Sequence, residues 1–399
     1  MSASGSPHPR RIHRARRGLA AVIAVSVLIA GCSSGRTSGP GSSGGTPTSA
    51  VDAQVAAGID HEMVQYTSYD RIRAILVIAN GRTVFERYYR STASESHNVA
   101  SVTKSVTSTL VGIAMGEGRL RLDQPLAQLL PTYAATMTPA VAHATLRQVL
   151  TMTAGFAGQF SADDVGFATA PDWVRAILTH PARPPGRSFS YSSGGSHLLS
   201  AILATATGTS VLDYARAKLF DPLGIPTRPA FQPLPTASNI DAYQNAGFAW
   251  PLDPQHRHAG FGFLKLRPRD MAKIGTLYLN GGRWQGRQLV PAAWIRDATT
   301  AHATAADGAT TSYGYQWWVG TAAGDPAYLG IRRTTHRDRA PPPPRRRHLH
   351  LHRPEGPQRP RHHPLRPHRH GRHGHRPGDT QVRSDLDTTT AYQPGRATY

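Results

Sequence analysis

The sequence predicts an α+β protein, and three observations support that fold class. Two strand-like segments, 74–79 and 83–89, are joined by an Asn-Gly pair, which is typical of a type I′ β-hairpin. The long region 98–279 instead repeats apolar residues every three or four positions, which is the helical period. A third strand-like segment, the aromatic run 313–319, follows the helices.

The helices are expected where apolar residues keep the helical period and turn residues end each run. Gly155 and Gly208 end two of these runs, and Ser210 with Asp213 forms a capping box that begins another. The sequence predicts helices at 51–67, 98–114, 145–153, 172–178, 196–207, 210–221 and 270–279, with a loop-rich stretch at 226–260.

The net charge of +21 on the 399 residues is concentrated at the two ends. Residues 1–32 hold five Arg and no acidic residue, and residues 331–399 hold 16 Arg against five acidic residues. Residues 33–330 therefore carry a net charge of only +5, which is ordinary for a soluble domain. The basic balance does not indicate nucleic acid as a partner, because no aromatic residues interleave with the arginines at 332–383 of the tail.

Residues 1–31 have the pattern of a secretion signal. Five arginines in 10–17 precede an apolar run of about a dozen residues, which is too short to span a bilayer. The run ends at Cys32, the only cysteine, in a pattern that resembles a bacterial lipobox. We expect a lipidated Cys32, a flexible tether over 32–50, and a protein exported to the outer face of a bacterial cell membrane. The alternative is an ordinary signal peptide with an incidental cysteine.

Ser101 and Lys104 form a Ser-x-x-Lys motif at the start of the helix predicted at 98–114. The spacing places both residues on one helical face. A serine hydroxyl is a weak nucleophile until a neighbouring base accepts its proton, and a lysine whose pKa is lowered by burial can do so. N–H groups at the helix N-terminus favour the developing negative charge. In isolation, a capping serine and a solvated lysine explain the motif better.

Several motifs accompany Ser101-Val102-Thr103-Lys104 in a fixed order: the Leu120-x-Leu122-Asp123-x-Pro125 turn, Leu150-Thr151-Met152-Thr153-Ala154-Gly155, Tyr191-Ser192-Ser193 and the strand at 313–319. Together they resemble the serine β-lactamase-like hydrolases, which include class C β-lactamases, D-alanyl-D-alanine carboxypeptidases, esterases and 6-aminohexanoate-dimer hydrolases. The resemblance covers about residues 55–330 and implies an antiparallel sheet flanked by helices, with an inserted helical region. We therefore expect the hydrolase domain at 51–330.

The resemblance implies a role for each matched residue. Ser101 would be the acylated nucleophile, and Lys104 would share in its activation. Tyr191 would pass a proton to the leaving group and then activate water, although a packed loop aromatic is the alternative for this residue. Ser193 stands where many members have Asn, so a hydroxyl replaces the amide that would contact Lys104 and the substrate. This change weakens the expectation of β-lactamase activity more than that of hydrolysis in general.

The chain departs from the family pattern after Gly330. The family has an edge strand carrying a Lys-Thr-Gly or His-x-Gly triplet, which supplies an oxyanion-hole N–H, and Arg-Thr-Thr-His at 333–336 is not a convincing match. We therefore expect the C-terminal strands to be missing. Residues 331–399 are rich in Arg, Pro and His and predict a disordered tail. Because the change is abrupt, we interpret the tail as translated out of frame; a genuine low-complexity tail is the alternative.

The expected function is an exported serine hydrolase that cleaves an amide or ester bond of a small molecule or peptide through an acyl-enzyme on Ser101. No cofactor or metal is expected, because His256-x-His258 and the His pairs of the tail lack partners fixed by a fold. Two other functions stay open: a catalytically inactive penicillin-binding-like scaffold acting as a binding or cell-wall interaction protein, and a basic surface-binding protein led by its tail. The sequence does not distinguish β-lactam, peptide, ester and linear amide substrates.

Overall fold

The computed structural model describes residues 50–65, 72–79, 81–158, 166–186, 188–305, 312–322 and 325–330 of the chain. The predicted signal peptide, Cys32, most of the tether, the tail after Gly330 and the segment 333–336 lie outside these residues.

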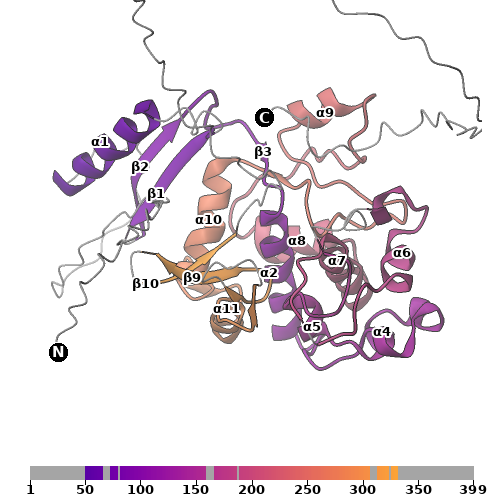
Figure 1. The fold of residues 1–399 in the computed structure, drawn as a ribbon. Helices are drawn as coiled ribbons and strands as arrows, with labels where there is room; N and C mark the ends of the chain where they lie inside the picture. The colour runs from indigo at the N-terminus through magenta and orange to yellow at the C-terminus, as the bar shows by residue number, and fades with distance from the viewer. Residues whose placement is uncertain are drawn as a thin grey trace, which may run out of the picture. The chain divides into compact units, whose positions relative to one another are not determined.

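The first described elements are a helix and a two-stranded hairpin (Figure 1). β1 (Ala74–Ala79) and β2 (Arg82–Tyr88) pair antiparallel, which confirms the predicted hairpin. Gly81 has a φ of 73°, the left-handed conformation that a type I′ turn requires, while Asn80 lies outside the described residues. α1 (Ala50–Gln65) packs against β2, and α10 (Pro268–Leu279) packs against β1.

A four-stranded antiparallel sheet lies at the end of the described part of the chain. Its order is β10-β9-β8-β7, with β7 (Ala303–Thr304), β8 (Ser312–Tyr313), β9 (Trp318–Ala322) and β10 (Asp325–Leu329). The single strand predicted at 313–319 is wrong, because the chain turns between β8 and β9. In this turn the Gly314 N–H donates to the Trp317 carbonyl at 2.8 Å, and Gln316 has a φ of 64°. The turn cannot be seen in the sequence, because its residues Tyr315 and Trp317 are aromatic and buried, like Tyr313 and Trp318 of the two strands.

Most of the remaining elements of the described residues are helices, as predicted. The other helices are α2 (Val102–Gly116), α3 (Leu126–Leu129), η2 (Pro131–Thr136), α4 (Pro139–His143), α5 (Leu146–Leu150), η3 (Gly166–Thr169), α6 (Trp173–Thr179), α7 (Ser193–Thr207), α8 (Val211–Ala215), η4 (Arg216–Phe220), α9 (Ile240–Asn245) and α11 (Ala292–Ala298). Two short strand pairs, β3 (His97–Asn98) with β4 (Lys265–Leu266) and β5 (Arg283–Trp284) with β6 (Arg287–Gln288), complete the fold.

Four points of the helix prediction need correction. The helix predicted at 98–114 begins only at Val102, because His97 and Asn98 pair as β3 with β4. The helix predicted at 145–153 ends at Leu150, because Met152 adopts a left-handed φ of 61°. α9 lies inside the stretch predicted to be loop-rich, and α11 was not predicted. Short helices carry too few periodic positions for the helical period to be seen in the sequence.

α2 is the buried centre of the helical region. Val106 and Leu110 are fully buried, and α7 packs along the helix (Figure 1). A Cβ atom on Gly112 would lie 2.3 Å from the ring of Trp294, so the approach of α11 to α2 requires glycine there. Among the described residues no single helix is long and apolar enough to span a membrane; only α7 together with Val211–Phe220 meets those criteria, as a pair bent by 78°.

Gln316 joins α2, α5 and α7 to the turn between β8 and β9. Its backbone N–H and its side-chain amide both donate to the carbonyl of Leu150, at 3.2 and 2.9 Å. Its side-chain oxygen accepts a hydrogen bond from Ser196 at 2.8 Å, and its carbonyl accepts one from Ser105 at 2.9 Å. The side chain is 2% exposed, so these bonds satisfy polar groups that have no access to water.

Candidate active site

Ser101 lies at the first turn of α2, after a sharp change of chain direction. Ala100 has a φ of 46°, which is rare for a residue with a side chain, and its N–H donates to Asn98 Oδ1 at 2.8 Å. The carbonyl of Ala100 then accepts the N–H of Thr103, and that of Ser101 accepts the N–H of Lys104. The turn therefore places the Ser101 hydroxyl at the positive end of α2.

Lys104 is close to the Ser101 hydroxyl, as the motif predicts. Its Nζ donates to Ser101 Oγ and to the carbonyl oxygen of Phe261, each at 3.1 Å. The side chain is only 1% exposed, and its Nζ lies 4.9 Å from the ring centroid of Tyr191. The geometry therefore gives Ser101 a buried amine within hydrogen-bond distance.

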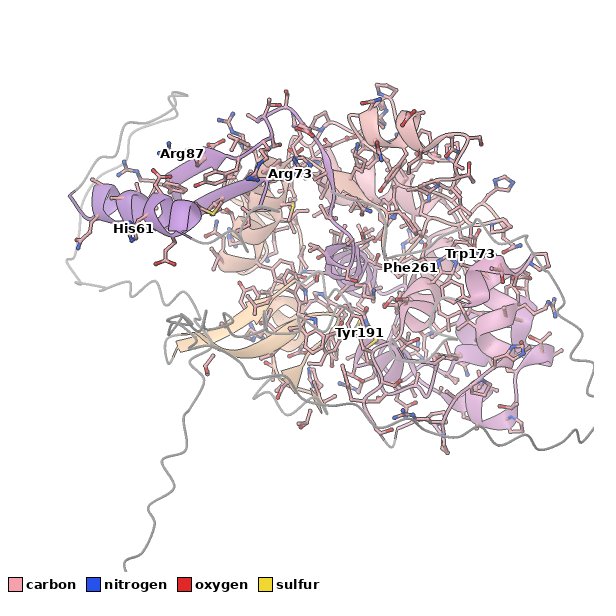
Figure 2. The ribbon with its side chains drawn as sticks, turned by 45° about the horizontal axis from the view of Figure 1, so that its top comes forward. His61, Arg73, Arg87, Trp173, Tyr191 and Phe261 are labelled. Carbon is pink, nitrogen blue, oxygen red and sulfur yellow. The ribbon has the colours of Figure 1, made fainter. Side chains whose placement is uncertain are left out.

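Tyr191 forms the aromatic side of this site. Its ring stacks on Trp318 at 5.4 Å and meets Tyr313 edge-on at 6.0 Å. Burial, followed by the nearby Tyr191 phenol, raises the pKa of Tyr313 well above its ordinary value. The structure therefore brings Tyr191 beside Lys104, although the two residues lie 87 positions apart in the chain. Figure 2 shows Tyr191 and Phe261 in the same part of the molecule as Trp173, away from His61 of α1 and Arg87 of β2.

Ser193 begins α7 and is 8% exposed. The neighbouring Ser192 caps the helix, because its Oγ accepts the N–H of Gly195 at 3.0 Å. The Tyr-Ser-Ser motif therefore ends in a helix N-terminus, which fixes the backbone on which Tyr191 lies.

The end of β10 lies against α2, the helix that follows Ser101. A Cβ atom on Gly330 would lie 3.2 Å from Ser105 Oγ and 3.4 Å from Val102, both in the first turns of α2. The last strand predicted from the sequence was 313–319, and β10 was not predicted. β10 forms an edge strand directly after β9. The segment that would carry the third motif begins after Gly330, outside the described residues.

The carbonyl of Phe261 and, behind it, the buried pair of His197 with Asp253 were not predicted. A backbone acceptor leaves no mark in the sequence. The sequence signals the pair only through His197, which lies next to the apolar residues Leu198 and Leu199 in α7.

Of the histidines weighed as metal ligands, only His256 and His258 belong to the described residues; those of the tail lie outside them. His258 is 1% exposed, and burial lowers its pKa to about 4. His256 is exposed. In the described part of the chain no group of three or more His, Cys, Asp or Glu side chains could hold a metal ion.

Comparisons with known proteins agree on one family. The Beta-lactamase family model matches residues 73–335. Penicillin-binding protein 4 of Amycolatopsis lactamdurans is 34% identical over 130 residues, which are 31% of this chain and 33% of that protein. The 6-aminohexanoate-dimer hydrolase of Paenarthrobacter ureafaciens is 25% identical over 286 residues, which are 64% of this chain and 66% of that protein. The chain thus spans between a third and two thirds of the length of these relatives.

Among solved structures, the penicillin-binding protein from Bacillus halodurans superposes with a TM-score of 0.51 at 17% sequence identity. The match covers 67% of this chain and 86% of that chain. At this identity the likeness shows the fold, in which antiparallel strands and an inserted helical region surround α2.

Proposed function

Because the chain belongs to the Beta-lactamase family, whose model matches residues 73–335, we propose that it is a serine hydrolase that forms an acyl-enzyme on Ser101. One observation carries the proposal: the Nζ of the buried Lys104 lies 3.1 Å from Ser101 Oγ. A buried amine is held in its basic form more easily than a solvated one, so it can accept the serine proton.

In the proposed acylation the neutral Lys104 amine accepts the proton of Ser101 while Oγ bonds to the substrate carbonyl carbon. The tetrahedral oxyanion develops beside the N-terminus of α2, where the helix dipole favours negative charge. The carbon–nitrogen or carbon–oxygen bond then breaks, and the leaving group takes up a proton through the Tyr191 phenol. Water activated by the same groups attacks the acyl-enzyme, releases the acid and returns the proton to Ser101.

The proposed substrate carries an amide or ester bond in a small molecule or peptide. One relative is named a hydrolase of the 6-aminohexanoate dimer and another a penicillin-binding protein, so their names point to amide-containing ligands. Ser193 in place of the family's Asn supplies a shorter polar group at the site, which favours linear amides and esters over β-lactams.

The test is covalent labelling of Ser101. The full chain is treated with a fluorophosphonate and, separately, with a labelled penicillin, then digested, and the adduct is mapped by mass spectrometry. We expect an adduct on Ser101 and none on Ser101→Ala. If the wild-type chain is not labelled, or Ser101→Ala is labelled equally, the inactive scaffold becomes the better interpretation.

We further propose that the protein is exported and held at the cell membrane by a lipidated Cys32. The support is the lone cysteine after a charged and then apolar leader. Cys32→Ala should move the protein from the membrane fraction to the soluble fraction of expressing bacteria, which an immunoblot of both fractions would show. Ser33→Ala serves as the control. A Cys32→Ala protein that stays in the membrane fraction would contradict lipid anchoring.

A further inference from the structure

A buried histidine–carboxylate pair lies behind the site. His197 Nε2 and Asp253 Oδ2 are 2.9 Å apart, and both side chains are fully buried. Asp253 Oδ1 accepts the N–H groups of Gln255 and Arg257 at 2.8 and 2.7 Å. Burial acts to raise the pKa of Asp253, but the hydrogen bond from His197 and the backbone N–H and charge of Arg257 hold it below its ordinary value. The carboxylate therefore stays ionised and fixes the imidazole.

The other ring nitrogen of His197 faces the segment that reaches the site. The N–H of Gly260 donates to His197 Nδ1 at 3.5 Å, so Nδ1 is the acceptor and Nε2 carries the proton that is donated to Asp253. Aromatic rings surround the imidazole: Phe167 stacks on it at 6.1 Å, and Trp173 meets it edge-on at 5.2 Å. The ring is therefore held in one orientation and one tautomer.

The segment Gly260-Phe261 lies between α7 and α2. A Cβ atom on Gly260 would lie 2.5 Å from the carbonyl of Ser196, so the segment touches the backbone of α7. On its other side, Thr107 of α2 donates to the Gly260 carbonyl at 3.1 Å. The next carbonyl, that of Phe261, accepts the Lys104 Nζ at 3.1 Å. The ring of Phe261 also packs edge-on against His197, with centroids 6.1 Å apart.

We propose that His197, oriented by Asp253, is a positioning residue that holds the Phe261 carbonyl against Lys104 and so sets the placement of its amine beside Ser101. The importance of this placement for catalysis rests on the proposed function; the placement itself does not.

The proposal predicts a change in the protonation of Lys104. A carbonyl that accepts from Nζ stabilises the ammonium form, so moving this carbonyl away should lower the pKa of Lys104. Tyr191 faces the Nζ directly, and its phenol is left unchanged in the variants below. A hydrogen bond to a charged group is strong enough for the loss to shift the titration midpoint by about one pH unit.

The experiment uses the four lysines of the chain, Lys104, Lys218, Lys265 and Lys273. The full-length protein is grown with lysine labelled at ¹³Cε and titrated by NMR, with the Lys104 signal assigned by its loss in Lys104→Arg. Two variants of His197 separate its two hydrogen bonds. Asn places its terminal atoms near the position of Nδ1 and can accept from Gly260, whereas Gln reaches the position of Nε2 and keeps only the contact with Asp253.

We expect His197→Gln to lower the Lys104 midpoint by about one pH unit and His197→Asn to leave it within about 0.3 units of wild type. The acid limb of the pH profile for Ser101 labelling should move with the midpoint. The control is His258→Asn, which changes a buried histidine two residues from Gly260 whose ring nitrogens form no hydrogen bond among the described residues. Circular dichroism checks that each variant is folded.

Equal Lys104 midpoints in wild type and His197→Gln, or equal shifts in the Gln and Asn variants, would overturn the proposal. If a variant does not fold, a measurement on the wild type alone still tests the proposal. We expect ¹⁵N-histidine NMR to show His197 Nδ1 without a proton. A protonated Nδ1 would overturn the proposal. A Lys104 midpoint that shifts in a protein whose Ser101 is never labelled leaves the positioning intact and removes the proposed hydrolase function.

Discussion

Lys104 and Lys265 are both buried, but their surroundings give them different roles. Their side chains are 1% and 3% exposed, and each Nζ lies near a tyrosine ring, 4.9 Å from that of Tyr191 and 5.5 Å from that of Tyr243. Lys265 donates to three backbone carbonyls at the end of α9, those of Tyr243, Gln244 and Ala246, at 3.0, 2.6 and 2.8 Å. Lys104 instead reaches the hydroxyl of Ser101.

The difference shows that burial alone does not make a lysine a candidate catalytic residue. Carbonyl oxygens only accept hydrogen bonds, so the partners of Lys265 cannot exchange a proton with it, and the lysine acts as a cap on the C-terminus of α9. A hydroxyl can both accept and donate, so the pair of Lys104 and Ser101 can transfer a proton. The chemical nature of the partner therefore separates the two roles.

The largest expected effect is on acylation. Lys104→Met should lower the second-order rate of Ser101 labelling by about 10³-fold, because the base that accepts the serine proton is lost. Lys265→Met should change the same rate by less than about threefold, since the hydrogen bonds of Lys265 go to backbone carbonyls at the end of α9 and not to the Ser101 hydroxyl. The rates are measured with a fluorophosphonate under pseudo-first-order conditions. Equal losses in the two variants would show that the lysines do not differ in the way described.

The next effect is on the free energy of unfolding, and here we expect the larger loss in the Lys265 variant. Lys265→Met removes the donor of three hydrogen bonds at the C-terminus of α9 and should lower the free energy of unfolding by about 2 kcal/mol. Lys104→Met replaces a buried amine by an apolar side chain of similar length and should change it by less than about 1 kcal/mol. Urea unfolding followed by circular dichroism measures both values. The comparison fails if Lys104→Met is the more destabilised variant.

The smallest effect is a pH dependence that belongs to Lys265. Burial lowers the pKa of Lys265 from 10.5 to about 8. Between these values the unfolded chain binds more protons than the folded one, so this residue makes the free energy of unfolding rise with pH. The difference between wild type and Lys265→Met should therefore grow by about 1.5 kcal/mol from pH 8 to 9.5.

The tyrosines with raised pKa values, such as Tyr88 at about 12, act in the opposite direction above pH 10 and are common to both proteins. They cancel in the difference between wild type and variant. A difference that stays constant from pH 8 to 9.5 would contradict the lowered pKa of Lys265.

The sequence predicts those parts of the fold and the site that depend on local spacing. The hairpin follows from an Asn-Gly pair between two apolar runs, and the Ser101–Lys104 contact follows from a separation of three residues on a helix. Tyr191 is farther away in the chain and was placed by the order of family motifs, which the structure confirms as a spatial grouping.

Other parts depend on contacts that leave no local pattern. The Phe261 carbonyl is a backbone group, and His197 and Asp253 are 56 residues apart. The turn between β8 and β9 lies inside an aromatic run because its aromatic side chains are buried; the ring of Tyr315 packs against Trp294 of α11, with centroids 5.1 Å apart. In each case tertiary packing decides the structure, and the alternation of residue types cannot show it.

The hydrogen bonds of Gln316 have a consequence for how the molecule opens. Its backbone and side chain bind groups of α2, α5 and α7 at once, so the turn between β8 and β9 cannot separate without breaking bonds to all three helices. Amide hydrogens in the inner turns of these helices should therefore exchange with solvent in one cooperative event, with a shared opening free energy, rather than helix by helix. The Ser101–Lys104 pair at the start of α2 lies inside that cooperative unit and keeps its geometry for as long as the unit stays closed.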